Sequence, residues 1–267
     1  MRIDAAFVEV IERLDSFFRE NHIRFILFGA VVPMLLVESK DEDGIGFGIR
    51  MTKDLDCVLR VDDWDEYGHI VKHLTENGFV PKPGEPPHRL FYRDFPVDLI
   101  PFGTRIIQNN ILQWPNTEIR MHVPGFEHLF RHAKMERISD RVSVPVIPLP
   151  LAVYTKILAF LNRRLKRDLV DVLYMLEHYE EIQLSERRYE EGVPDSMLYE
   201  MRGAFLIGKD LRPLLPDETL AHLAPFFRTV ENPYAPDLQA AFRDRRMGVD
   251  GCVGLLRAFQ EGLGFRL

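Results

Sequence analysis

Three carboxylates in the first half of the chain could act together. Asp54 and Asp56 are separated by the apolar Leu55, and Asp98 follows within Pro96-Val97-Asp98-Leu99-Ile100. Side chains alternate along an extended strand, so Asp54 and Asp56 would point to the same face. A third carboxylate from a neighbouring strand would complete an oxygen-rich cluster of the kind that holds Mg²⁺ or Mn²⁺ together with substrate phosphates. This pattern indicates a phosphoryl-transfer site.

The residues around the Asp pair are consistent with a buried strand that has a polar end. Arg50 and Thr52 would share the face of the two carboxylates if the segment is one strand, and the apolar run 57–59 would hold it in the sheet. An Asp-x-Asp spacing nevertheless arises easily by chance in a chain with 41 acidic residues. The alternative interpretation is an exposed turn or a salt-bridged strand end.

A small-residue turn precedes this segment. Gly29-Ala30 follows the apolar run 23–28, which is typical of a strand, and leads into a helical segment that extends through Leu36. Without bulky side chains, such a turn lets the backbone and a helix N-terminus approach a phosphate closely. A tight strand-to-helix turn without a ligand is the alternative.

Length and composition favour an ordinary globular protein of two domains. The 267 residues exceed the roughly 150 that serve as a prior for one domain. With 46% hydrophobic and 28% charged residues, the chain can bury a sizeable core. No apolar run approaches the ~18 residues that span a bilayer, and the N-terminus is typical of an amphipathic helix, not a signal peptide. We therefore expect a cytoplasmic location and no membrane partner.

Charge and cysteine content argue against a general nucleic-acid-binding protein and against a zinc-bound or disulfide-linked fold. A net charge of −7 argues against broad nucleic-acid binding, although a local basic patch remains open. Cys57 and Cys252 lack the spacing of a zinc site or disulfide framework, and Cys57 is expected in a buried strand.

Hydrophobic periodicity predicts alternating helices and strands in the first half of the chain. The expected elements are a helix over 5–20, a strand over 23–28, a helix to 36, an exposed loop over 40–48, the strand of the Asp pair, a helix from 62 to about 77, a loop over 81–87 and a hairpin over 89–100. Two histidine pairs at helical spacing, His69/His73 and His128/His132, lack a third ligand, so we interpret them as amphipathic-helix residues.

A proline-rich segment, 144–150, predicts a boundary between domains 1–147 and 148–267. A long helix from Leu151 to about Tyr179 is expected next, followed by mostly helical sequence with breaks at 192–195, 213–217 and 232–236. Along the long helix one polar line would face the active site: Lys156, Arg163, Arg167 and Asp171. The alternative is a solvated face whose ion pairs contribute only ~0.5 kcal/mol each.

Taken together, these segments resemble the nucleotidyltransferase superfamily that includes DNA polymerase β, and more closely its AbiEii-like branch of toxin nucleotidyltransferases. The Gly29-Ala30 turn is similar to the family's Gly-Gly or Gly-Ser motif, and Arg50-x-Thr52-x-Asp54-Leu55-Asp56 is similar to its R-x-[ST]-x-D-[IL]-D strand. Asp98 stands where a third carboxylate is expected. The most specific match is the second-domain helix pattern Lys156-x6-Arg163-x3-Arg167-Asp168-x2-Asp171.

The resemblance implies an α+β protein, in which a small mixed sheet flanked by helices is followed by a mainly α-helical domain. An NTP and two Mg²⁺ or Mn²⁺ ions would bind between the domains. Asp54 and Asp56 would coordinate the metals, while Asp98 would help to bind the second metal and assist deprotonation of the acceptor. Lys156 would be the fourth catalytic residue. The implied nucleotide-binding residues are Gly29, Ala30, Arg50, Thr52, Lys156, Arg163, Arg167, Asp168 and Asp171, of which the two acids would position the basic groups.

The function predicted from this resemblance is metal-dependent transfer of a nucleoside monophosphate from an NTP to a hydroxyl of an RNA, protein or small molecule. A toxin role in toxin–antitoxin or phage-defence systems would add an antitoxin protein as a partner. The alternative is a noncatalytic nucleotide-binding or interaction protein with the same fold. An aminoglycoside-modifying type of transferase is a third option, since an acidic protein would suit a cationic acceptor.

Overall fold

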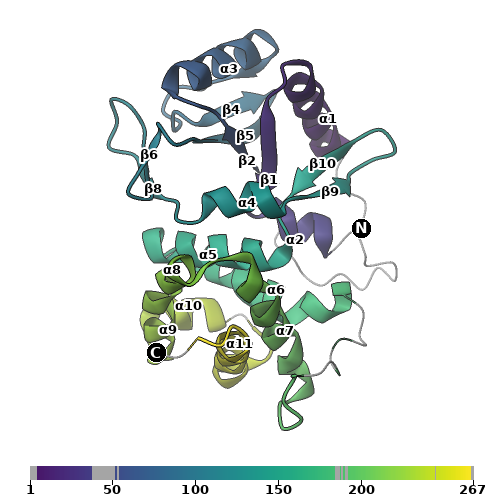
Figure 1. The fold of residues 1–267 in the computed structure, drawn as a ribbon, viewed down its shortest axis with the longest axis vertical. Coiled ribbons are helices and arrows are strands. Elements are labelled where there is room, and N and C mark those ends of the chain that lie inside the picture. Colours follow the sequence, from purple (N-terminus) through teal and green to yellow (C-terminus); the bar gives the residue numbers. More distant parts are fainter. Residues whose placement is uncertain are drawn as a thin grey trace. The chain divides into compact units, whose positions relative to one another are not determined.

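The computed structural model describes residues 5–37, 52, 54–183, 187, 189, 192–243 and 245–265. The chain forms two compact units (Figure 1). The first comprises Met1–Leu35 and Met51–Pro148, and the second comprises Leu36–Arg50 and Leu149–Leu267. The predicted loop over 40–48 lies outside the described residues.

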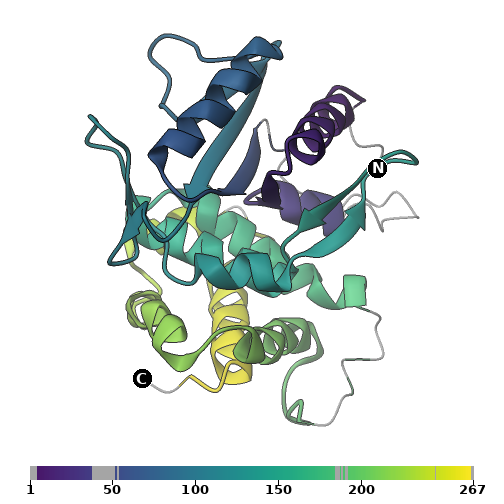
Figure 2. The same cartoon turned by 45° about the horizontal axis from the view of Figure 1, so that its top comes forward.

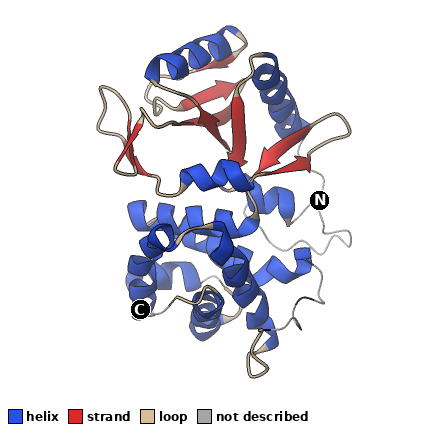
Figure 3. Ribbon diagram, viewed as in Figure 1, coloured by secondary structure: helices blue, strands red, loops and turns tan. Residues whose placement is uncertain are grey.

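A mixed seven-stranded sheet forms the centre of the first unit (red in Figure 3). Its strand order is β3-β4-β5-β2-β1-β10-β9, in which β2 is parallel to β5 and β1 is parallel to β10, while the other neighbours are antiparallel. The strands are β1 (Arg24–Phe28), β2 (Leu55–Arg60), β3 (Phe79–Val80), β4 (Arg89–Tyr92), β5 (Phe95–Phe102), β9 (Lys134–Arg137) and β10 (Ser143–Val146). The central position of β2 explains why its apolar side chains are fully buried.

Helices cover both faces of this sheet. Phe25 of β1 contacts Phe18 of α1 (Ala5–Glu20), with 4.7 Å between ring centroids. Phe28 of the same strand contacts Phe126 of α4 (Phe126–His132), with 5.8 Å between centroids. Because the side chains of Phe25 and Phe28 point to opposite faces of an extended strand, α1 and α4 pack on opposite sides.

Two further helices of the first unit begin where the sequence predicts a helix start. The helix α2 (Val31–Leu36) follows the Gly29-Ala30 turn directly. The helix α3 (Trp64–Glu76) begins after Asp63, whose side chain accepts a hydrogen bond from the backbone N–H of Glu66, and it ends at Asn77. A three-stranded antiparallel sheet completes the unit with β6 (Ile107–Gln108), β7 (Ile111–Gln113) and β8 (Arg120–His122).

The second unit is helical. Its main helices α7 (Arg202–Leu211) and α11 (Gly248–Gly262) pack with their backbones in close approach (green and yellow in Figure 2). A Cβ on Gly208 would lie 2.3 Å from the carbonyl oxygen of Phe259, and one on Gly262 would lie 1.9 Å from that of Phe205. The other helices are α5 (Leu149–Arg163), α6 (Lys166–Gln183), α8 (Asp217–Leu220), α9 (Ala224–Val230) and α10 (Pro236–Phe242), with 3-10 turns at Tyr199–Met201, Arg212–Leu214 and Ala221–Leu223.

The prediction of one long helix over 151–179 is wrong. The chain leaves the helix at Arg164, which has a left-handed φ of 52°, and α6 starts at Lys166. Residues 162–167 are all exposed, so no apolar face holds a continuous helix across this stretch. The polar line of Lys156, Arg163, Arg167 and Asp171 is therefore divided between two packed helices and is not one helix face.

The predicted α+β class is confirmed, with the sheet in the first unit and helices in the second. The strand of the Asp pair is shorter than expected, since β2 starts at Leu55 and Asp54 precedes it in a bend. None of the helices within the described ranges is both long and apolar enough to cross a membrane.

Candidate active site

Strand pairing brings two of the three predicted carboxylates side by side. Asp56 of β2 pairs with Asp98 of β5 in the parallel register, and Asp56 pairs with Phe28 of β1 on its other side. Directly paired residues share a face, so both carboxylates lie on the face covered by α4. Asp98 is buried with 7% of its surface exposed, whereas Asp54 and Asp56 are partly exposed.

The backbone at Gly29 is pressed against the carboxylate of Asp56. Gly29 has a φ of +78°, and a Cβ at this position would lie 2.1 Å from Oδ2 of Asp56 and 2.8 Å from its Cγ. Only glycine combines this left-handed backbone with so close an approach. The neighbouring Ala30 is buried at 5% exposure. The small-residue turn therefore makes room for a carboxylate of the same site.

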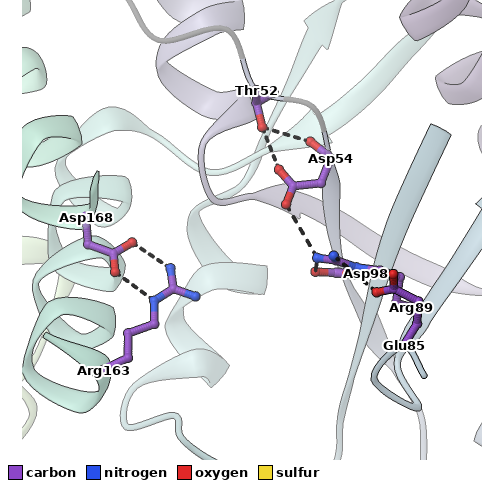
Figure 4. Close-up of polar contacts among 7 residues, drawn as sticks. All are labelled: Thr52, Asp54, Glu85, Arg89, Asp98, Arg163 and Asp168. Atoms are coloured by element: carbon purple, nitrogen blue, oxygen red, sulfur yellow. Dashed lines mark hydrogen bonds and ion pairs between the residues drawn. The ribbon is translucent and has the colours of Figure 1, made fainter. Parts of the chain in front are cut away.

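Thr52 fixes the orientation of Asp54. The hydroxyl Oγ1 of Thr52 lies 2.7 Å from Oδ1 of Asp54 and 3.0 Å from its backbone carbonyl oxygen (Figure 4). Thr52 is 7% exposed, so this hydroxyl is in a protected position. A hydroxyl that donates to a carboxylate oxygen holds the carboxylate in one rotamer. The other oxygen of Asp54, Oδ2, points toward Arg89.

Arg89 of β4 contacts two of these carboxylates, Asp98 and Asp54. Its Nε and Nη2 donate to Oδ1 and Oδ2 of Asp98, each at 2.7 Å (Figure 4). Nη2 also lies 3.5 Å from Oδ2 of Asp54, and Nη1 lies 3.6 Å from Oε2 of Glu85. One guanidinium thus joins two of the three predicted metal ligands.

The electrostatics of the site reflect this arrangement. Hydrogen bonding to Asp98 raises the pKa of Arg89 above its ordinary value, which keeps the guanidinium charged at every accessible pH. Burial raises the pKa of the Cys57 thiol, and the negative charges of Asp56 and Asp98 raise it further. Cys57 is fully buried in β2, as the sequence predicts.

The second unit holds a separate network of charges, in which Lys156, Asp168 and Asp171 are buried and Arg163 is exposed. Lys156 of α5 lies 2.6 Å from Oδ2 of Asp171 and 3.8 Å from Oδ1 of Asp168, both on α6. Arg163 donates from Nε and Nη2 to the two oxygens of Asp168 at 2.7 Å and 2.6 Å (Figure 4). The carboxylate of Asp168 has no exposed surface. In this network the acidic residues hold the basic ones in place, while Arg167 is exposed.

The predicted site residues thus fall into two groups, each described within its own unit. Thr52, Asp54, Asp56 and Asp98 gather with Gly29 in the first unit, and Lys156, Arg163, Asp168 and Asp171 gather in the second. Arg50 lies outside the described residues. Over the described part of the chain, no three or more His, Cys, Asp or Glu side chains are arranged as a ready-made metal site. The roles predicted for these residues stay predictions.

Sequence reasoning missed Arg89, although a local signal was present. Arg93-Asp94 forms a two-residue turn between Tyr92 and Phe95, which pair directly. Counting outward from this turn places Arg89 opposite Asp98. Hairpin register follows from loop length, so the expected hairpin over 89–100 could have identified this pair.

Comparison with known proteins identifies a family. The model described as "Nucleotidyl transferase AbiEii toxin, Type IV TA system" matches residues 45–244. No curated protein matches the chain. Among solved structures, the chain is similar to the antibiotic-resistance factor ANT(2'')-Ia in solution, at 13% identity and a TM-score of 0.37, covering 85% of this chain and 94% of that one.

Proposed function

Because this chain belongs to the AbiEii family of nucleotidyl transferase toxins of type IV toxin–antitoxin systems, we propose that it transfers a nucleoside monophosphate from an NTP to an acceptor hydroxyl with the help of a divalent metal ion. The observation that carries the proposal is the pairing of Asp56 with Asp98 on adjacent parallel strands, with Asp54 in the bend directly before β2. The labelling experiment described below tests whether an NTP is the substrate and whether a divalent metal ion is required.

The donor set fits Mg²⁺ or Mn²⁺. These hard cations prefer oxygen ligands, and Mg²⁺ is commonly held by one or two carboxylates together with substrate phosphates. Asp54 and Asp56 supply two such carboxylates in partly exposed positions, and Gly29 leaves the space beside Asp56 free of a side chain. We propose that these two residues hold the metal. When bound, it would stabilise negative charge on the reacting phosphate and orient the triphosphate.

The reaction is a displacement at the α-phosphorus. The acceptor oxygen forms a bond to this phosphorus, the bond to the β-phosphate oxygen breaks, pyrophosphate leaves with that bonding pair, and the acceptor proton passes to water. Thr52 would contribute by holding Asp54 in one rotamer. Both oxygens of Asp98 already accept hydrogen bonds from Arg89, so we do not assign Asp98 the proton of the acceptor.

We also propose nucleotide-binding roles for three basic residues, Lys156, Arg163 and Arg167. Lys156 and Arg163 are held by Asp171 and Asp168, which fixes their positions and leaves Lys156 with further donors. Arg167 is exposed and can be replaced without disturbing a buried pair. An Arg167→Ala variant should bind an NTP more weakly while unfolding at the same temperature as the parent protein.

Transfer is tested with each α-labelled NTP in turn. The purified protein is incubated with Mg²⁺ or Mn²⁺ and with cellular RNA, cellular protein or a small-molecule extract, and label is followed into each fraction. The negative control is Asp54→Asn/Asp56→Asn. The matched control is Asp94→Asn, because Asp94 is an exposed acid at a hairpin turn that contacts only Lys82 among the ion pairs described.

Label that is lost in the double variant, and that Asp94→Asn still transfers, would support the proposal and identify the base and the acceptor class. Label that persists in the double variant would contradict the assigned site. NTP binding without transfer to any of the three fractions would favour a noncatalytic nucleotide-binding protein. If transfer occurs, we expect a cognate antitoxin to counteract it in the cell, as type IV toxin–antitoxin membership implies.

A further inference from the structure

The position of Arg89 bears on how many metal ions this site can hold, an inference that rests on the proposed function. Arg89 and Asp98 face each other on β4 and β5, and both oxygens of Asp98 accept hydrogen bonds from the same guanidinium. The Asp98 side chain is only 10% exposed. An ion at Asp98 would need to displace the guanidinium or to bind beside its positive charge.

The guanidinium is fixed in this position by several contacts. A two-bond pairing with a carboxylate is a strong and directional interaction for arginine. Glu85 and Asp54 lie 3.6 Å and 3.5 Å from the same group, so three carboxylates surround it. The Arg89 side chain as a whole is 26% exposed. Arg89 thus has the charge and partners of a bound cation but cannot dissociate.

We propose that Arg89 is a built-in cation that takes the place of a second metal ion, so that the protein binds a single divalent ion, at Asp54 and Asp56, with its nucleotide. Arg89 is in this view a positioning residue: it neutralises Asp98, prevents that carboxylate from binding metal, and adds positive charge beside Asp54. A merely structural role, in which Arg89 only joins β4 to β5, would not limit the number of ions.

The number of bound ions distinguishes these roles. Equilibrium dialysis with Mn²⁺ and a non-hydrolysable NTP analogue, with both quantified, measures the ions retained per bound nucleotide. We expect one ion for the parent protein, two for Arg89→Gln, in which Asp98 becomes available, and one for Arg89→Lys, which keeps a cation at this position. The matched control is Arg93→Gln, because Arg93 lies on the same hairpin but pairs with Glu9 and is 71% exposed.

A second variant keeps the test decisive if Arg89→Gln does not fold. Asp98→Asn should still bind one ion per nucleotide, because Asp98 is not a ligand in this proposal. Two ions in the parent protein, or one ion in a folded Arg89→Gln, would overturn the inference and leave the proposed function in place. Absence of nucleotide-dependent Mn²⁺ in the parent protein would overturn both.

Discussion

Arg89 and Asp98 form a pair with two hydrogen bonds across strands β4 and β5, with both N–O distances at 2.7 Å. The same Asp98 is the parallel partner of Asp56. Strand β5 therefore lies between the strand of Arg89 and the strand of Asp56. The carboxylate edge of the sheet is therefore partly neutralised by the protein itself. In our proposal, this relationship gives Asp98 a different role from that of Asp54 and Asp56.

Replacing either of the two partly exposed aspartates should remove ligand-induced stabilisation. A ligand present at a hundred times its Kd stabilises a folded protein by about 2.7 kcal/mol. For the parent protein, a non-hydrolysable NTP analogue with Mg²⁺ should raise the Tm, and Asp54→Asn or Asp56→Asn should lose most of that rise. Differential scanning calorimetry measures it, with Asp94→Asn as the control. An unchanged rise in both variants would rule out these residues as ligands.

Replacing Gly29 by alanine should impair the site through Asp56. The new Cβ would meet Oδ2 of Asp56 at 2.1 Å, and the left-handed φ of +78° adds about 1 kcal/mol of strain. We expect nucleotidyl transfer to fall at least about tenfold, the equivalent of 1.4 kcal/mol in the barrier. Gly84→Ala is the matched control, because Gly84 has a φ of +82° with no atom within 4 Å of the added Cβ. Equal activity of the two variants would show that the approach to Asp56 is unimportant.

Removing the Thr52 hydroxyl should affect Asp54 specifically. Thr52→Val deletes the donor 2.7 Å from Oδ1 of Asp54 while keeping the shape of the side chain, whereas Thr52→Ser keeps the hydroxyl. The lost charge-assisted hydrogen bond corresponds to about 1.5–3 kcal/mol in general. We expect Thr52→Val to weaken metal-dependent nucleotide binding about tenfold and Thr52→Ser to resemble the parent protein in the same titration. A loss shared by both variants would point to packing instead.

Breaking the buried ion pair of the second unit should cost stability. Asp171→Ala leaves the 8% exposed Lys156 without its partner at 2.6 Å, and loss of one member of a buried pair costs about 3 kcal/mol. Urea unfolding followed by circular dichroism would report the free energy of unfolding. Asp237→Ala is the control, since Asp237 is 48% exposed and lies 3.9 Å from Arg164, so the change should stay within about 0.5 kcal/mol. A similar loss of unfolding free energy in Asp171→Ala and Asp237→Ala would mean that the ion pair between Lys156 and Asp171 does not stabilise the fold.

Both cysteines should resist alkylation in the folded protein. Burial raises the pKa of Cys57 and raises that of Cys252 to about 11, and the reactive species is the thiolate. At pH 8 the thiolate fraction is therefore below that of an ordinary cysteine, and access is blocked as well. Iodoacetamide labelling followed by mass spectrometry should detect modification in denaturant but not under native conditions. Rapid native labelling of Cys57 would indicate that β2 is accessible.

Much of the fold was predictable because its signals are local. The helix over 5–20 and the helix capped by Asp63 follow from periodicity and capping residues, and the strand of Phe28 follows from a short apolar run. The prediction of one helix over 151–179 is wrong, because the helical spacing continues past Arg164 although no apolar face supports a helix there. A helical spacing is evidence only where packing supports it.

The sequence by itself determined the types of chemical group and their local faces. Alternation along a strand depends only on neighbouring backbone geometry, so it applies to Asp56 in β2 but not to Asp54, which lies in a bend before the strand. Tertiary structure decided which groups meet: Gly29 against Asp56, Asp56 beside Asp98, and Lys156 against Asp171 on a different helix. These contacts join residues far apart in the chain, and they depend on strand order and helix packing, which buried apolar surface selects for the whole unit at once.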